Sequence, residues 1–220
     1  MKKNYNFNPI DALKDLGDFI KNHASYVKDL NLDKGDRAAE IFEAFGYVSV
    51  ADAFFKHGYS VNALNSNNKF TFKKTPSSVA SNYSYFQVGK NNKTYFILKD
   101  HNIAGSLQGT FNLDVVVSRI LIDKKLEKND FLSVIECKLC KGVSSSLFSS
   151  FRGIAFDSVI LHRWMDTNYP PPLLYTSGKP TKYSSDFIWN TIQKYWVSGA
   201  FGISGHQNSN PLYFWLNGYV

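Results

Sequence analysis

The chain has 220 residues, a formal net charge of +7 and an isoelectric point near 9.2. Hydrophobic residues make up 44% of it and aromatic residues 16%, a composition that supports a packed core and excludes an intrinsically disordered chain. This length fits one domain with additions. The positive charge favours an anionic partner such as nucleic acid, although the lysines are scattered and form no basic tail.

The N-terminus begins with the basic residues Met1-Lys2-Lys3, but no apolar run follows them. A signal peptide needs such a run, and a membrane-spanning helix needs a longer one. The sequence therefore predicts a cytoplasmic protein with no membrane partner.

Helical periodicity dominates the first quarter of the chain. Apolar residues recur at helical spacing over residues 8–32 and again over residues 36–57, which predicts two helices with a break at 31–35. Gly46 lies inside the second of these helices and is expected to divide it into two.

Short β-prone runs bounded by turn residues follow. They predict strands at 60–64, 85–88, 93–98, 111–117 and 131–139. Residues 65–84 predict a loop or an inserted hairpin, residues 101–110 a Gly-containing loop, and residues 123–130 a charged linker.

The last third of the chain predicts further helices and one strand. Three serines, Ser144 to Ser146, are typical of a helix N-terminus and precede a helical pattern that runs to Leu161. After the break at Pro170-Pro171-Pro172 we expect a strand at 173–177 and a last helix at 184–197, while the tail from 198 to 220 follows no clear pattern.

Charged residues interrupt two of the apolar strand runs. Asp114 lies within the run at 111–117, and Glu136 and Lys138 lie within the run at 131–139. Because side chains alternate along a strand, Glu136 and Lys138 point to the same side, and a neighbouring strand would bring Asp114 beside them. Two carboxylates suit a hard divalent cation, and a nearby lysine can position a water.

Asp followed by Glu-x-Lys on the next strand resembles the signature of the PD-(D/E)xK phosphodiesterase superfamily, which includes many restriction endonucleases. The resemblance covers residues 36–178, where the predicted order of a helix, three or four strands, a helix and a strand matches the αβββαβ core of the family. It departs from the family pattern at Leu113, where many members have proline. It implies an α/β, restriction-endonuclease-like fold with a mixed central sheet flanked by helices. The domain would span 36–220 after a helical extension at 1–35, with an insertion at 65–84.

The resemblance also implies an activity, a Mg²⁺-dependent endonuclease that hydrolyses phosphodiester bonds of DNA, with Mn²⁺ able to substitute. Restriction and phage defence are roles that fit it. Asp114 and Glu136 would bind the metal together with the backbone carbonyl of Cys137, and Lys138 would orient the attacking water. Family members often add an acidic residue from the preceding helix. Glu43 is the first candidate for it, ahead of Glu40 and then Asp52.

Double-stranded DNA is the expected partner, and cutting both of its strands favours a homodimer. Gln108, Lys141 and Arg152 lie near the motif in sequence and are candidates for contacts with nucleic acid. A plain loop position explains Gln108 better than a contact does, and a surface charge explains Lys141 and Arg152 equally well.

Other interpretations fit the same residues. Glu136 and Lys138 can form a salt bridge at the end of an edge strand, and Asp114 can end its own strand. The fold can also serve as a non-catalytic nucleic-acid-binding or protein-interaction module. An aromatic interface is a third possibility, formed by Trp189, Trp196, Phe201, Tyr213, Phe214 and Trp215.

Two further patterns suggest less specific chemistry. Cys137 and Cys140 have no second cysteine pair to complete a zinc site, so we interpret them as packing residues. His57, His101 and His206 allow a histidine hydrolase, but no H-x-H or G-x-S-x-G motif supports one.

Overall fold

The computed structural model describes residues 7–65, 68–74, 83–105, 109–121, 125–127, 129–156, 170, 172–180, 196–198, 212 and 216. Three α-helices are defined there: α1 (Pro9–His23), α2 (Ala38–Lys56) and α3 (Ser145–Phe156). The strands are β1 (Asp29–Leu30), β2 (Ser60–Leu64), β3 (Lys69–Phe70), β4 (Tyr85–Lys90), β5 (Lys93–Ala104), β6 (Thr110–Ser118), β7 (Phe131–Lys138), β8 (Gly142–Val143), β9 (Leu173–Thr176), β10 (Lys179–Pro180) and β11 (Trp196–Ser198).

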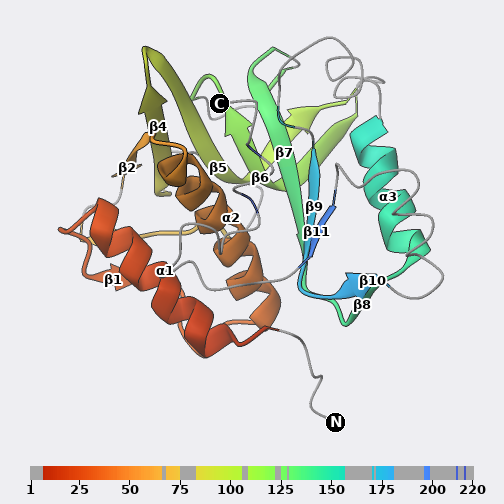
Figure 1. The fold of residues 1–220 in the computed structure, drawn as a ribbon, viewed down its shortest axis with the longest axis horizontal. Helices are drawn as coiled ribbons and strands as arrows, with labels where there is room; N and C mark the ends of the chain where they lie inside the picture. Colours follow the sequence, from red (N-terminus) through yellow and green to blue (C-terminus); the bar gives the residue numbers. More distant parts are fainter. Residues whose placement is uncertain are drawn as a thin grey trace.

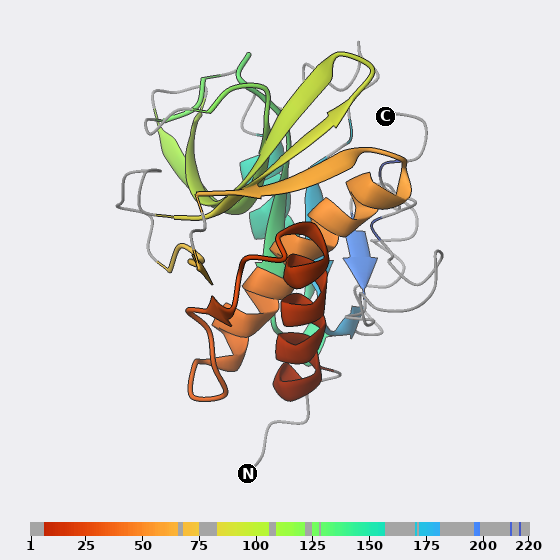
Figure 2. The ribbon, with the colours of Figure 1, turned by 90° about the vertical axis from the view of Figure 1, so that its left-hand side faces the viewer.

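One seven-stranded sheet forms the centre of the molecule, in the order β11-β9-β7-β6-β5-β4-β2. Within this sheet, β2, β4, β5, β6 and β7 pair antiparallel, whereas β9 pairs parallel with β7 and β11 pairs parallel with β9. Helices α1 and α2 lie on one side of this sheet and α3 on the other (Figures 1 and 2). The protein is thus a mixed α/β fold with a mostly antiparallel sheet flanked by helices, as predicted at this level.

Helix α2 lies between α1 and the sheet and is buried along almost its whole length, from Ile41 to Phe54, with Glu43 as the partly exposed exception. Its sequence is apolar on every side, which is the composition of a helix enclosed by other elements. The residues of α1 that face it, including Leu16 and Ile20, belong to the same core. The predicted boundary between an extension at 1–35 and a domain at 36–220 stays a prediction.

The first predicted helix is shorter than its periodicity indicated. Asn8 caps α1 by accepting a hydrogen bond from the backbone of Ile10, and Pro9 begins the helix. The prediction of helix up to residue 32 is wrong beyond His23. Residues 28–31 instead hydrogen-bond to residues 68–70, and β1 pairs parallel with β3.

Gly46 does not divide α2, which is continuous; the predicted break is wrong. A β-carbon at this position would lie 2.5 Å from Cys137 Sγ and 3.2 Å from Tyr175 Cδ1. The glycine therefore allows the helix to approach β7 and β9 closely.

Between the predicted strands at 85–88 and 93–98, the residues Gly89 to Asn92 predict a turn. The hairpin of β4 and β5 turns there at Asn91 and Asn92, both with positive φ. Strand β5 then continues to Ala104, so the prediction of a loop from residue 101 is wrong for residues 101–104. These residues pair with the first half of β6, and this longer ladder outweighs the polar sequence His101-Asn102. Positive φ recurs inside β5 at Asp100.

Towards the C-terminus, Ser144 accepts a hydrogen bond from the backbone of Leu147 and caps α3, and β9 forms at the predicted place. The predicted helix at 184–197 is wrong at its end, because Trp196 and Val197 lie in β11. Three further predictions fall outside the described residues: the rest of that helix, the positions of the tail aromatics other than Trp196, and the continuation of a helix from Phe156 to Leu161. Within the described residues, no helix combines the length and apolar composition needed to cross a membrane.

Candidate metal centre

Three carboxylates lie in a row across three neighbouring strands. Asp100 in β5 falls between the pairs Lys99–Val115 and His101–Leu113, which places it opposite Asp114 of β6. One step beyond the Val115–Ile135 pair, Asp114 also lies beside Glu136 of β7. Like charges opposite one another destabilise a sheet, so this row needs compensating positive charge.

Asp114 lies in the middle of β6 and is 8% exposed, so it does not end its strand. Strand β7 lies between β6 and β9 and is not an edge strand. The salt bridge between Glu136 and Lys138 does form at the end of β7, but the prediction is wrong in placing it on an edge strand and in ending a strand at Asp114. The charged residues interrupt the centre of the sheet, where unpaired charge is costly.

Lys138 provides part of the compensating charge. Its Nζ lies 2.5 Å from Glu136 Oε1 and 3.7 Å from Asp114 Oδ2. The alternation of β7 places Glu136 and Lys138 on the same side, as the sequence predicted, while the side chain of Cys137 is buried in the core with Gly46.

A backbone hydrogen bond joins the two parts of the motif. The N–H of Cys137 donates to Asp114 Oδ2 at 2.6 Å. This bond orients the Asp114 carboxylate and leaves its other oxygen for a further partner.

Helix α2 contributes Glu43 to the same place. Lys99 Nζ lies 3.5 Å from Glu43 Oε2 and also contacts Asp100 Oδ2. Carboxylate oxygens of Glu43, Asp100 and Asp114 lie within 4.8 Å of one another. The cluster thus holds four carboxylates and two ammonium groups, and its formal charge of −2 with all groups ionised matches one divalent cation.

Glu43, Asp114 and Glu136 hold protons more tightly than usual. Burial raises the pKa of Glu43 to about 7, and the charge of Asp114 adds to the shift. Burial and Asp114 together raise the pKa of Glu136 to about 7 as well. Burial also raises the pKa of Asp114 itself.

The two lysines stay charged for the opposite reason. Burial alone would lower their pKa values, but the carboxylates around them have the greater combined effect. Asp100 and Glu43 raise the pKa of Lys99, and Asp114 and Glu136 raise that of Lys138.

The structure thus brings together the predicted residues Glu43, Asp114, Glu136 and Lys138. The other helix candidates lie elsewhere: Glu40 pairs with Arg37 at 3.2 Å, and Asp52 pairs with Lys56 at 2.7 Å.

Of the three candidates for nucleic-acid contacts, only Lys141 has a side chain that the structure describes. Lys141 is exposed beyond the end of β7. Gln108 and the side chain of Arg152 lie outside the described residues.

Sequence reasoning missed Lys99 and Asp100. The signal was present, since two adjacent charges directly follow the apolar run Tyr95-Phe96-Ile97-Leu98. The apolar run ends at Leu98, however, and strand periodicity predicts opposite sides for adjacent residues. The positive φ of Asp100 breaks that periodicity, and both side chains reach one cluster.

The oxygen atoms of this cluster fit a hard divalent cation such as Mg²⁺. Among the described residues, the buried Oε2 of Glu136 has no hydrogen-bond partner. Such an oxygen atom, at a site with two excess negative charges, fits a metal ligand.

Comparison with known proteins adds nothing to these observations. No family model, no curated protein and no solved structure matches the chain. The site must therefore be interpreted from its own geometry.

Proposed function

We propose that the protein is a Mg²⁺-dependent endonuclease that hydrolyses phosphodiester bonds of DNA. One observation carries the proposal: Asp114, Glu136 and Lys138 meet in the middle of the sheet, with Glu43 of α2 beside them. This chemistry needs oxygen ligands for a metal and a cation near the attacking water, and both are present.

The order of the elements supports the resemblance to the PD-(D/E)xK superfamily. Helix α2, the antiparallel strands β5, β6 and β7, helix α3 and the parallel strand β9 follow the order αβββαβ, with β2, β3 and β4 added between α2 and β5 and the short β8 before α3. Asp114 lies on the second of these strands and Glu136 and Lys138 on the third. Membership of the superfamily, and the restriction-endonuclease-like core, are part of this proposal.

In this mechanism Asp114 and Glu136 would hold the cation, with the carbonyl of Cys137 as a further ligand. Mg²⁺ bound there would polarise the phosphoryl group and lower the pKa of a bound water. Lys138, which already pairs with both carboxylates, would orient the attacking water and neutralise charge that develops on the phosphate. Glu43, whose pKa is about 7, is suited to exchange a proton at neutral pH.

The test is cleavage of supercoiled plasmid with Mg²⁺ or Mn²⁺, comparing the wild type with Asp114→Asn and Lys138→Met. We expect metal-dependent cleavage that both substitutions reduce by at least about 100-fold, since they remove a metal ligand and the cation beside the water. Asp18→Asn and Lys14→Met are matched controls, because both residues are exposed on α1.

Two results would contradict the proposal. One is a folded wild type that cuts neither single- nor double-stranded DNA with either metal. The other is cleavage that survives in both site variants. The ratio of nicked to linear product also shows whether one site or two act in a single binding event, and linear product is expected from a homodimer.

A further inference from the structure

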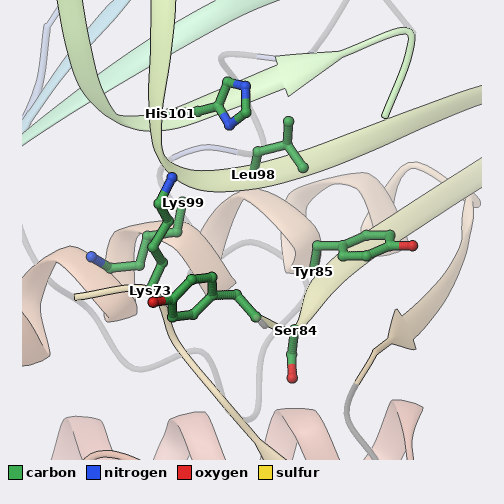
Figure 3. Close-up of a pocket in the computed structure, with 7 residues that line it drawn as sticks. Lys73, Ser84, Tyr85, Leu98, Lys99 and His101 are labelled. Carbon is green, nitrogen blue, oxygen red and sulfur yellow. The ribbon is translucent and has the colours of Figure 1, made fainter. Parts of the chain in front are cut away.

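A hollow adjoins the metal centre on the β4–β5 side. It is lined by Lys73, Tyr83, Ser84, Tyr85, Leu98, Lys99 and His101, and the space within it together with the open solvent at its mouth amounts to about 350 Å³. Lys73 and Lys99 lie on one side of it and Tyr85 on the other, with Leu98 and His101 above them (Figure 3).

Lys99 belongs both to the hollow and to the metal centre. It lines the hollow, and its ammonium group pairs with Glu43 and Asp100 of the metal centre. A ligand in the hollow would therefore lie next to the position of the scissile phosphate.

The walls of the hollow are fixed by hydrogen bonds. The side chain of Asn31 bonds the backbone N–H and carbonyl of Phe72 at 2.7 and 2.9 Å, directly before Lys73. Ser84 joins the same segment to the start of β4, because its backbone N–H donates to Thr71 O and its hydroxyl accepts from Thr71 N, each at 2.9 Å. The hollow is thus built before any ligand arrives.

One wall is aromatic. Tyr85 begins β4 and is half-buried, and its ring meets the edge of Phe96 with centroids 6.2 Å apart. This contact holds the ring in place at one side of the hollow. Ammonium groups bind phosphate, and a fixed aromatic ring stacks on a base.

We infer that this hollow binds one nucleotide of the cleaved strand, next to the scissile phosphate. Lys73 contacts the phosphate of that nucleotide, and Tyr85 stacks on its base. The inference rests on the proposed function for the position of the scissile phosphate, and it adds a binding site that the Asp and Glu-x-Lys motif does not contain.

The test measures binding and cleavage of a short fluorescein-labelled oligothymidylate. Fluorescence anisotropy in EDTA gives Kd, and cleavage with Mn²⁺ gives kcat and KM. We expect Lys73→Met and Tyr85→Ala each to raise Kd and KM about tenfold and to change kcat by less than about twofold. Tyr85→Phe and Lys73→Arg keep the ring and the charge and should bind within about threefold of the wild type. Circular dichroism confirms that each variant is folded.

Lys93→Met is the matched control, because Lys93 is exposed at the far end of β5. Variants at Lys73 and Tyr85 that behave like Lys93→Met would overturn the inference, as would a wild type that binds no oligonucleotide. A wild type that binds through Lys73 and Tyr85 but cleaves nothing with any metal would support the nucleotide site itself and overturn the proposed function, and with it the position next to a scissile phosphate. The two failures are therefore distinguishable.

Discussion

The backbone N–H of Cys137 donates a 2.6 Å hydrogen bond to Oδ2 of Asp114. This bond fixes the carboxylate of β6 against the middle residue of Glu136-Cys137-Lys138. Because Cys137 directs its side chain into the core and its backbone N–H to the Asp114 carboxylate, packing of the core and geometry of the candidate site are linked at this one residue.

The first prediction concerns metal affinity. Asp114→Asn removes a negative charge but keeps an oxygen that can accept the bond from Cys137. Loss of an outer-shell partner typically lowers metal affinity about 10–100-fold, so loss of this direct ligand should lower Mn²⁺ affinity by at least about 100-fold. Isothermal titration checks this. Asp18→Asn should bind as the wild type does, and equal affinities for all three proteins would show that the ion is held elsewhere.

The second prediction concerns pH. Glu43 has a pKa of about 7 in the fold against 4.5 ordinarily, and Glu136 is raised in the same way. Between pH 4.5 and about pH 7 the folded state therefore binds more protons than the unfolded state. The free energy of unfolding falls as pH rises through this range. The free energy of unfolding of the metal-free protein should decrease from about pH 5 to about pH 8.

Glu43→Gln isolates the contribution of one group. In this variant the free energy of unfolding should fall by roughly 1–3 kcal/mol less than in the wild type over the same pH range, allowing for partial solvent exposure of Glu43. Urea denaturation at the two pH values measures it. Mg²⁺ should oppose the loss of stability, because cations and protons compete for the same oxygens. An unchanged pH slope in Glu43→Gln would contradict the assignment.

The third prediction concerns the approach of α2 to the sheet. Gly46→Ala places a β-carbon 2.5 Å from Cys137 Sγ. Overpacking of this kind costs about 1–3 kcal/mol, more than the gain of up to about 1 kcal/mol in helix propensity. The variant should be destabilised in urea denaturation.

Two comparisons sharpen this result. Gly17→Ala in α1 meets no atom within 4 Å and should stabilise the protein by about 0.5–1 kcal/mol. Adding Cys137→Ala to Gly46→Ala removes the clashing sulfur and should cost less than the two single substitutions combined. A Gly46→Ala variant as stable as Gly17→Ala would show that the helix does not pack this closely.

The fourth prediction concerns Lys99, whose side chain is 5% exposed between Glu43 and Asp100. Lys99→Met leaves these carboxylates without their shared cation, which should destabilise the metal-free protein by about 3 kcal/mol. Saturating Mg²⁺ should restore part of this loss by binding the same oxygens.

The matched control is Lys74→Met, which breaks the more exposed pair with Asp36 and should cost less than about 1 kcal/mol. Equal destabilisation of the two variants, or a loss that Mg²⁺ leaves unchanged, would argue against a charge-balanced metal centre.

Several elements of the fold were predictable because their signals are local. The strand at Ser60–Leu64, the turn at Asn91-Asn92 and the cap at Ser144 depend on neighbouring residues alone, and all three form as expected. The predictions failed where distant segments compete with local preference. Residues 28–31 leave the helix to pair with residues 68–70, and residues 101–104 leave a predicted loop to pair with β6.

The residues of the candidate site also separate into those that local sequence predicts and those that only tertiary structure brings together. The sequence by itself determined that Glu136 and Lys138 share one side of a strand, because strand alternation is a property of the backbone. It also singled out Asp114 and Glu43 as candidates. Only the tertiary structure decided that Asp114 lies beside Glu136, and that Lys99 and Asp100 join them through a backbone with positive φ. The order of strands in a sheet and the conformation of one residue depend on the packing of the whole chain, which no local pattern encodes.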